Sequence, residues 1–291
     1  MKYAYYPGCS SHSTAKEYDH SLRAVCSRLG IELVEIKDWF CCGSTPAHSV
    51  SRLLASALPL GNLAIVQKMG FKEVVVPCAS CFSRFKTALH DLQNEPRLRE
   101  EIGQIIEGNW GDDITVYHPL QIFSEEPQLG KISSLAKQGL AGLKVVCYYG
   151  CLLTRPPKVT EFDTCEYPES MDRVLRALGI ATLDWSYKTD CCGAAFALTR
   201  TDIVLKLSHD ILEGAKSVGA DAIAVACPLC HTNLDTRQEE IEKTYGADYK
   251  LPILYFTQLM GISFGLSSQE LLLEKHLVSP QRKLEEVKQH A

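Results

Sequence analysis

The stretch AIAVACPLC at residues 222–230 carries an apolar run directly into two cysteines that are separated by two residues. The stretch VVVPCASC at residues 74–81 has the same layout. A short apolar run of this kind is typical of a buried strand in a parallel sheet. In such sheets functional groups gather at the carboxyl ends of the strands. The sequence therefore predicts an α/β fold in which each Cys-x-x-Cys pair lies at that edge.

These two stretches belong to an internal repeat that spans most of the chain. Tyr6-Pro7-Gly8-Cys9 corresponds to Tyr148-Tyr149-Gly150-Cys151, and Cys41-Cys42-Gly43 corresponds to Cys191-Cys192-Gly193. The first correspondence has an offset of 142 residues, the second has one of 150, and the Cys-x-x-Cys pairs have one of 149. One connection has therefore changed length, while the order of the motifs is the same in both halves.

Strand and helix signals alternate in the same order in both halves. The expected strands cover residues 2–6, 31–36 and 74–76 in the first half and residues 144–148 and 222–226 in the second. The expected helices cover residues 16–29 and 50–69 in the first half and residues 171–178 and 204–218 in the second. Such alternation predicts right-handed βαβ units. We therefore expect two pseudo-symmetric Rossmann-like repeats, each with a parallel sheet and one cysteine motif.

The expected boundary between the repeats lies near residue 140. An N-terminal repeat is expected over residues 1–140 and a C-terminal repeat with a helical tail over residues 141–291. Residues 95–140 are polar and irregular, and we expect them to connect the halves. The tail from Ser268 onward carries three consecutive leucines followed by Lys and Glu residues, which favours a surface or partner-facing helix.

Composition excludes several classes of protein. The formal net charge of −5, with no long basic run, makes a nucleic-acid surface unfavourable. No window approaches 18 uninterrupted apolar residues, so no membrane span is expected. The start MKYAYYPGCS has no secretory pattern, and we expect a cytoplasmic protein. Thirteen cysteines in a reducing compartment indicate metal binding or redox chemistry rather than disulfides.

Ten of the thirteen cysteines form two ordered sets of five. The first set is Cys9, Cys41, Cys42, Cys78 and Cys81, and the second set is Cys151, Cys191, Cys192, Cys227 and Cys230. Thiolates select zinc, copper(I) or iron–sulfur clusters. Zinc explains each Cys-x-x-Cys pair, but five thiolates exceed the four positions of a zinc ion and also the four of a cubane cluster.

The adjacent cysteines further limit which metal centre the sequence predicts. Neighbouring residues of a helix or strand do not project to one face, so Cys41 and Cys42 can reach one site only from a turn. Gly43 and Gly193 are expected to permit that turn. A large or open cluster accommodates such ligands better than a single ion does, and we therefore favour iron–sulfur clusters over zinc.

The spacing Cys-x31-Cys-Cys-Gly-x34-Cys-x2-Cys and its repeat Cys-x39-Cys-Cys-Gly-x33-Cys-x2-Cys resemble the paired CCG domains of the B subunit of heterodisulfide reductase. The resemblance extends to CPLCHTNLD at residues 227–235, to Gly219-Ala220-Asp221 and to YFTQL at residues 255–259. It implies that each set of five cysteines binds one noncubane [4Fe–4S] cluster and that a disulfide is reduced between the two clusters. It also implies two partners, a ferredoxin-like protein (the C subunit of such complexes) and a flavoprotein (their A subunit).

Three functions remain open at this point: a disulfide reductase, or its reverse acting on thiols or a sulfur carrier; an electron-relay component with the chemistry elsewhere; and a zinc-stabilised scaffold. Dithiol exchange by one Cys-x-x-Cys pair is the ordinary alternative, but it leaves the other cysteines unused. His231 is a candidate catalytic residue, as a proton donor to substrate or a hydrogen-bond donor to cluster sulfur. Cys26 and Cys147 are expected to be packed thiols, and no role is predicted for Cys165.

Overall fold

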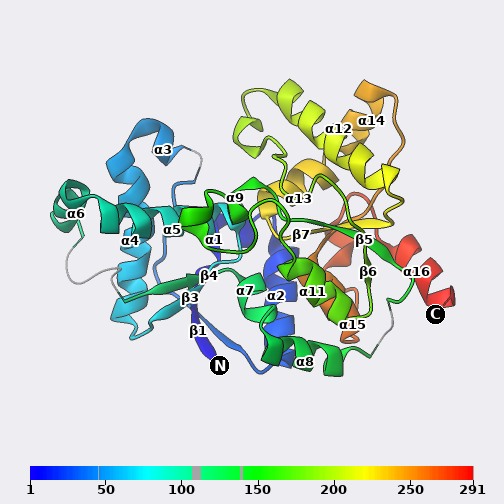
Figure 1. The fold of residues 1–291 in the computed structure, drawn as a ribbon, viewed down its shortest axis with the longest axis horizontal. Helices are drawn as coiled ribbons and strands as arrows, with labels where there is room; N and C mark the ends of the chain where they lie inside the picture. Colours follow the sequence, from blue (N-terminus) through cyan, green and yellow to red (C-terminus); the bar gives the residue numbers. More distant parts are fainter. Residues whose placement is uncertain (45, 107–112, 138–139, 291) are drawn as a thin grey trace.

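The computed structural model describes residues 1–44, 46–106, 113–137 and 140–290 (Figure 1). Two four-stranded sheets form its frame, with strand orders β2-β1-β3-β4 and β6-β5-β7-β8. Every strand pair is parallel, and in each sheet the four strands lie in the order second, first, third, fourth along the chain. The predicted α/β fold with two pseudo-symmetric repeats is therefore confirmed.

The strands are short, and the carboxyl ends of β1, β2 and β3 and of β5, β6 and β7 lead into the cysteine motifs. They cover Lys2–Tyr5 (β1), Glu32–Glu35 (β2), Glu73–Val75 (β3), Thr115–Tyr117 (β4), Lys144–Tyr148 (β5), Ala181–Thr182 (β6), Ala222–Val225 (β7) and Ile253–Tyr255 (β8). All four residues of β7 are buried, as expected for a central strand that is covered on both faces. In the register, Ala4 of β1 pairs with Val74 of β3, and Val145 of β5 pairs with Ala222 of β7.

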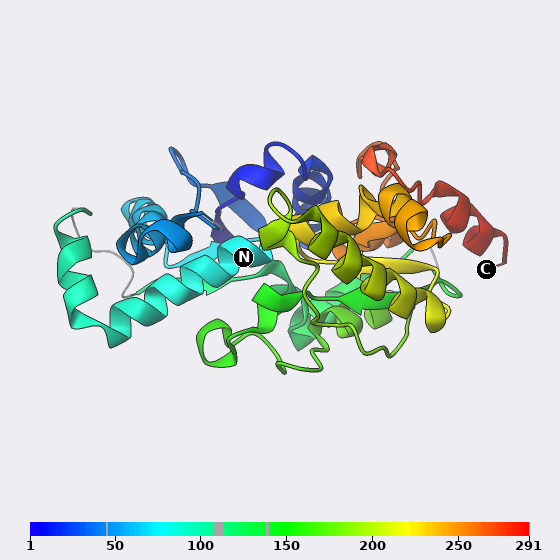
Figure 2. The same cartoon turned by 90° about the horizontal axis from the view of Figure 1, so that it is seen from above.

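Helices cover the sheets and extend the molecule at both ends (Figure 2). In the first half they are Gly8–Ser11 (α1), Lys16–Arg28 (α2), Ala47–Val50 (α3), Arg52–Lys68 (α4), Ala79–Asn94 (α5), Pro96–Gly103 (α6), Pro119–Phe123 (α7) and Glu126–Leu135 (α8). In the second half they are Cys151–Thr154 (α9), Pro157–Thr160 (α10), Ser170–Ala177 (α11), Thr201–Ser217 (α12), Pro228–Asp235 (α13), Gln238–Tyr245 (α14), Phe256–Ser263 (α15) and Gln281–His290 (α16), with 3-10 turns at Ala194–Phe196 (η1) and Leu273–Lys275 (η2). No helix in the described part of the chain is long and apolar enough to cross a membrane.

The two halves exchange helices. After the fourth strand of each sheet, the chain crosses to the other half, so that α15 packs against α2 while α7 and α8 pack against α11. At the first of these contacts the rings of Tyr18 and Tyr255 are stacked with centroids 4.3 Å apart, and Ser21 Oγ lies 2.7 Å from Thr257 Oγ1. One buried apolar cluster consequently runs through both halves.

Two expectations about the connecting and terminal segments are wrong. Residues 95–140 do not form an irregular connection, because they contain α6, β4, α7 and α8, and β4 completes the first sheet. A strand of three residues is too short to show an alternating pattern. The tail is helical only over α16 and at the short turn η2, and Leu271 and Leu273 are buried in the core instead of facing solvent or a partner.

Candidate metal centre

Three loops converge at the carboxyl edge of each sheet, and they carry the predicted cysteines. In the first half Cys9 lies in α1 directly after β1, Cys41 and Cys42 lie in the loop after β2, and the pair Cys78 and Cys81 opens α5 after β3. The second half repeats this arrangement with Cys151 in α9, Cys191 and Cys192 in the loop after β6, and Cys227 and Cys230 at the start of α13. The structure thus confirms that both Cys-x-x-Cys pairs lie at the carboxyl ends of strands.

Within the first set the thiols are in contact. Cys42 Sγ lies 3.1 Å from Cys81 Sγ, and the thiols of Cys41 and Cys42 are also hydrogen-bonded to each other. Gly8 has a φ angle of +74°, and a Cβ atom at this position would lie 3.3 Å from Cys81 Sγ. Glycine is therefore needed both for the turn after β1 and for the close approach of the cysteine.

The second set has the same construction. Cys192 Sγ lies 3.7 Å from Cys230 Sγ, and the thiols of Cys151 and Cys191 are hydrogen-bonded. Gly150 has a φ angle of +69°, and a Cβ atom there would lie only 3.0 Å from Cys230 Sγ. All thirteen cysteines are free thiols.

A tyrosine under each set holds the loop with the adjacent cysteines. Tyr6 donates its hydroxyl hydrogen to the carbonyl oxygen of Phe40 at 2.9 Å, and Tyr148 donates to that of Asp190 at 2.6 Å. Each acceptor is the residue immediately before the Cys-Cys pair. The Tyr-x-Gly-Cys pattern that both halves share was the signal for this role, which sequence reasoning did not assign.

Hydrogen bonds between neighbouring thiols determine which of them is the better anion. Hydrogen bonds from Cys41 and Cys81 lower the pKa of Cys42 to about 4, and the charge of Arg84 acts in the same direction. A hydrogen bond from Cys151 lowers the pKa of Cys191 to about 6. The donors Cys41 and Cys151 have raised pKa values for the same reason. Each set thus contains a thiolate at neutral pH, which is the form that binds metals.

The two sets meet where the chain halves meet. The thiol of Cys78 lies beside that of Cys227, and its interaction with Cys227 raises the pKa of Cys78. Hydrogen bonds from Cys230, which has the larger effect, and from Cys78 lower the pKa of Cys227. The first cysteine of each Cys-x-x-Cys pair therefore contacts its counterpart from the other repeat.

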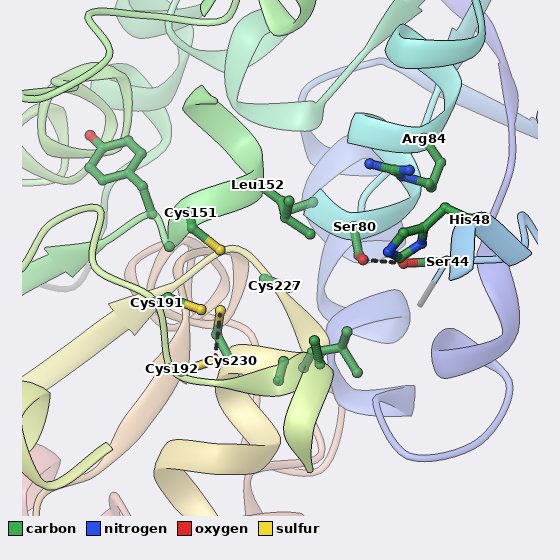
Figure 3. Close-up of a pocket in the computed structure, with 16 residues that line it drawn as sticks. Ser44, His48, Ser80, Arg84, Cys151, Leu152, Cys191, Cys192, Cys227 and Cys230 are labelled. Carbon is green, nitrogen blue, oxygen red and sulfur yellow. Dashed lines mark hydrogen bonds between the residues drawn. The ribbon is translucent and has the colours of Figure 1, made fainter. Parts of the chain in front are cut away.

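A cavity of about 190 Å³ opens between the halves beside the second set. All five cysteines of the second set line it, whereas the first half contributes residues that neighbour its own cysteines. Those first-half residues are Ser44, His48, Ala79, Ser80 and Arg84. In Figure 3 the sulfur atoms of Cys151, Cys191 and Cys230 point toward one another, and the polar side chains of the first half lie on the opposite side of the pocket. Ser44 and Ser80 are hydrogen-bonded there.

The donor set fits iron–sulfur clusters. Five soft thiols converge in each half without being oxidised to disulfides, and each group exceeds the requirement of one tetrahedral ion. A cluster that offers several iron atoms can engage adjacent cysteines and a Cys-x-x-Cys pair together. Cys26 and Cys147 lie outside both sets and are buried in α2 and β5, while Cys165 lies in a loop.

The structure does not bring His231 to the pocket. Its ring stacks on that of Tyr255 with centroids 4.6 Å apart, and its Nε2 atom lies 3.0 Å from Nδ1 of His276. His118 is also buried, with Nε2 2.8 Å from the carbonyl oxygen of Pro77. His48, by contrast, lines the pocket and is exposed.

Two further residues belong to the site and were missed. Asn233 donates from Nδ2 to the carbonyl oxygen of Cys192 at 3.1 Å and to Cys192 Sγ at 3.5 Å. Arg84, whose charge acts on Cys42, stands at the corresponding position of the first half, three residues after the second cysteine of the pair. Aligning the two halves on their cysteines places Arg84 opposite Asn233. Because a guanidinium and an amide have little chemistry in common, that alignment alone would not have shown that both side chains act on a cysteine.

A family of known proteins matches both halves of the chain. The family CCG, described as a cysteine-rich domain, matches residues 3–86 and 145–235, which contain both sets of cysteines. The membrane anchor component of 8-methylmenaquinol:fumarate reductase from Wolinella succinogenes is 28% identical over 95% of this chain and 97% of its own length. The B subunit of the ferredoxin/F(420)H(2)-dependent CoB-CoM heterodisulfide reductase from Methanosarcina acetivorans is 26% identical over 95% of this chain and 94% of its own length.

Among solved structures, that of a hypothetical protein from Helicobacter pylori has the same fold. Its TM-score is 0.75 at 12% sequence identity, and the match covers 96% of this chain. The chain spans about half of that protein's length, 52%.

Proposed function

This chain belongs to the CCG cysteine-rich domain family, and from that premise we propose that it is the iron–sulfur component of a heterodisulfide-reductase-like complex that reduces a disulfide to two thiols. The observation that carries the proposal is the contact between the two cysteine sets at Cys78 and Cys227, beside a cavity lined by both halves. Two relatives from Methanosarcina are named as B subunits of heterodisulfide reductases, and both match over nearly the whole chain.

The ten cysteines of the two sets are the proposed ligands, five for each of two noncubane [4Fe–4S] clusters. When bound, two such clusters supply the two electrons that reduction of one disulfide consumes. Cys42 and Cys191 are the positions at which iron would bind at the lowest cost of removing a proton, because their pKa values are already lowered.

The pocket residues of the first half are proposed to orient the substrate. Leu152, Leu229 and the neighbouring alanines give the cavity apolar walls, which exclude water from the sulfur atoms. Arg84 lies on the opposite wall and would bind an anionic end of the substrate. This assigns the substrate an apolar sulfur-bearing part and a carboxylate, sulfonate or phosphate.

Reduction of a disulfide also requires two protons. His48 lines the pocket and reaches solvent, so it is the proposed group through which protons enter. The proton-donor role predicted for His231 has no support from geometry, because its ring contacts Tyr255 and His276 and not the cavity. In the oxidative direction the same path would carry protons out.

A second function is favoured by one comparison. The relative from Wolinella is named as part of a quinol:fumarate reductase, whose named substrates contain no disulfide. An electron-relay component with the chemistry on another chain is therefore the alternative. In either case electrons arrive from partner proteins in the cytoplasm, for which we propose a ferredoxin-like protein and a flavoprotein, the C and A subunits of such a complex.

Two measurements test these proposals. Anaerobically purified protein should be brown and contain roughly eight iron and eight labile sulfide atoms per chain, the content of two four-iron clusters. A colourless protein with zinc and no labile sulfide would leave only the scaffold function. The purified chain is then mixed with a reduced viologen dye and candidate disulfides. Continuous dye oxidation with thiol release supports reductase activity, whereas oxidation that stops once the clusters are reduced supports a relay.

A further inference from the structure

Behind the second cysteine set, three side chains with metal-binding atoms are buried together. His231 and Asp235 are one turn apart on the same face of α13, and His276 comes from the segment that follows η2. Nε2 of His231 lies 3.0 Å from Nδ1 of His276. One ring nitrogen of each histidine and one oxygen of Asp235 all lie within 4.8 Å of one another. The three residues are only 4%, 1% and 6% exposed, in the order His231, Asp235 and His276.

We propose that His231, Asp235 and His276 bind a zinc ion that is distinct from the cysteine-bound metal. On a tetrahedral zinc ion the nitrogen ligands, each at about 2.0 Å, lie roughly 3.3 Å apart, which is close to the spacing of the two imidazoles here. An oxygen of Asp235 lies within 4.8 Å of the histidine ligand atoms, so a rotation of its side chain would bring it to the same ion. Two imidazoles and one carboxylate are nitrogen and oxygen ligands that zinc takes readily.

Neighbouring side chains form hydrogen bonds to the proposed ligands, as they do around the ligands of known metal sites. The other nitrogen of His276, Nε2, lies 2.8 Å from Nε2 and 3.1 Å from Oε1 of the Gln258 side chain. Gln258 is itself held, because its oxygen accepts the backbone N–H of Tyr255 and its amide group donates to the carbonyl oxygen of Leu271. Hydrogen bonds to the outer nitrogen fix the tautomer of a metal-binding histidine and leave the inner nitrogen free to coordinate.

Among the described residues, the carboxylates at this place form no ion pair. Both oxygens of Asp235 accept only backbone N–H groups, from Leu277 at 2.9 Å and Val278 at 3.2 Å. Burial raises the pKa of Glu17 at the start of α2, the positive charge of Lys275 lowers it, and the negative charge of Asp235 raises it to a smaller extent. Among the ion pairs of the described residues, none includes Asp235 or Glu17. Buried charges are normally paired or coordinate metals, so a divalent ion accounts for this arrangement.

The ion would join two parts of the chain that matter for the neighbouring site. α13 carries Cys230 one residue before His231, and residues 271–278 form the segment that closes over α13 and α15. A structural zinc ion here fixes the helix that supplies two cysteines of the second set. A tetrahedral zinc ion with three protein ligands keeps a fourth position for water. Because all three ligands are buried, no substrate reaches that position, and the role of the ion is structural.

The experiment is zinc X-ray absorption together with metal analysis of the full chain, expressed with added zinc and purified with its clusters. We expect about one zinc per chain with a nitrogen and oxygen first shell. His276→Ala and Asp235→Asn should each lose at least nine-tenths of that zinc while keeping their iron. The matched control is His209→Ala, since His209 also stacks on a tyrosine and bonds to a tyrosine hydroxyl, and it should keep the zinc.

Three outcomes would overturn the site: wild-type protein without zinc, zinc with sulfur ligands only, or zinc that survives both substitutions. The wild-type spectrum decides the question even if the variants fail to fold. Iron content in the same samples reports on the cysteine-bound clusters, so loss of this proposal is distinguishable from loss of the proposed redox function.

Discussion

In the first half Tyr6 holds the loop that carries Cys41 and Cys42, and in the second half Tyr148 holds the loop that carries Cys191 and Cys192. The glycine two residues after each tyrosine lets a Cys-x-x-Cys sulfur approach the backbone, so that an added Cβ atom would lie 3.3 Å from the sulfur at Gly8 and 3.0 Å from it at Gly150. The residues that shape the cysteine loops are thus the same in both halves.

The residues that carry charge differ between the halves. Arg84 acts on Cys42, whereas the corresponding Asn233 donates an amide hydrogen to Cys192. The cavity is lined by the cysteines of the second set, while the first half presents polar side chains to it. This difference indicates that the repeat preserves ligand geometry and varies the electrostatics, so the two proposed clusters should be alike in construction and unlike in potential.

The largest expected effect comes from removing one inner cysteine in each half. Cys42→Ala and Cys192→Ala should each lose roughly four of eight iron atoms per chain, because each removes a ligand from one cluster only. Disulfide reduction should stop in both variants, since the reaction needs an electron from each side. Iron analysis and the viologen assay measure the two effects. Full turnover in either variant would show that one site suffices.

The next comparison concerns an ion pair within α2 of the first half and an ion pair between α11 and the loop after β6 in the second half. Lys188 and Asp172 are almost completely buried and lie 3.0 Å apart, whereas Arg23 and Asp19 are partly exposed at 2.9 Å. Lys188→Met leaves the buried Asp172 carboxylate with the more distant Arg176, 3.9 Å away, as its cationic partner, and should cost about 3 kcal/mol of unfolding free energy. Arg23→Met should cost about 1 kcal/mol or less. Denaturant unfolding of both variants, loaded with metal to the same extent, measures the difference, and equal costs would contradict the contrast in burial.

A smaller effect is expected at the glycines. Gly8→Ala and Gly150→Ala both place a side chain in the left-handed region, which costs about 1–2 kcal/mol. At Gly150 the added methyl group also presses closer to a cysteine sulfur, so the second half should lose more iron than the first. Gly219→Ala is the control, because its φ angle is +75° but nothing lies within 4 Å. If all three variants retain equal iron, the close approach to sulfur has no role in cluster binding.

Sequence reasoning found the frame because the repeat is long and its cysteines are ordered. The strand expected over residues 144–148 is β5, and both Cys-x-x-Cys pairs follow central strands as predicted. The strands β4, β6 and β8 have only two or three residues, too few for a periodic signal. The exchange of α7 and α15 between halves depends on contacts between distant segments, which no local pattern encodes.

The side-chain roles were harder to predict than the ligands. His231 follows Cys230 directly, but consecutive residues of an α-helix point about 100° apart, so the ring turns toward His276 while the sulfur faces the pocket. Arg84 and Asn233 have no chemistry in common that a motif would show, and their role follows from position alone.

The smallest expected effect tests the difference in electrostatics directly. A positive charge stabilises the reduced, more negative form of a cluster, so Arg84→Gln should lower the reduction potential of the first-half cluster, on the order of 50 mV. Asn233→Leu removes only one neutral hydrogen bond to sulfur at 3.5 Å and should lower the second-half potential by a smaller amount. Redox titration of each substitution in the Cys192→Ala or Cys42→Ala background, where one cluster remains, assigns each potential to its half. Equal shifts in both halves, or a shift of the cluster opposite to the substitution, would mean that Arg84 and Asn233 are not the source of the asymmetry.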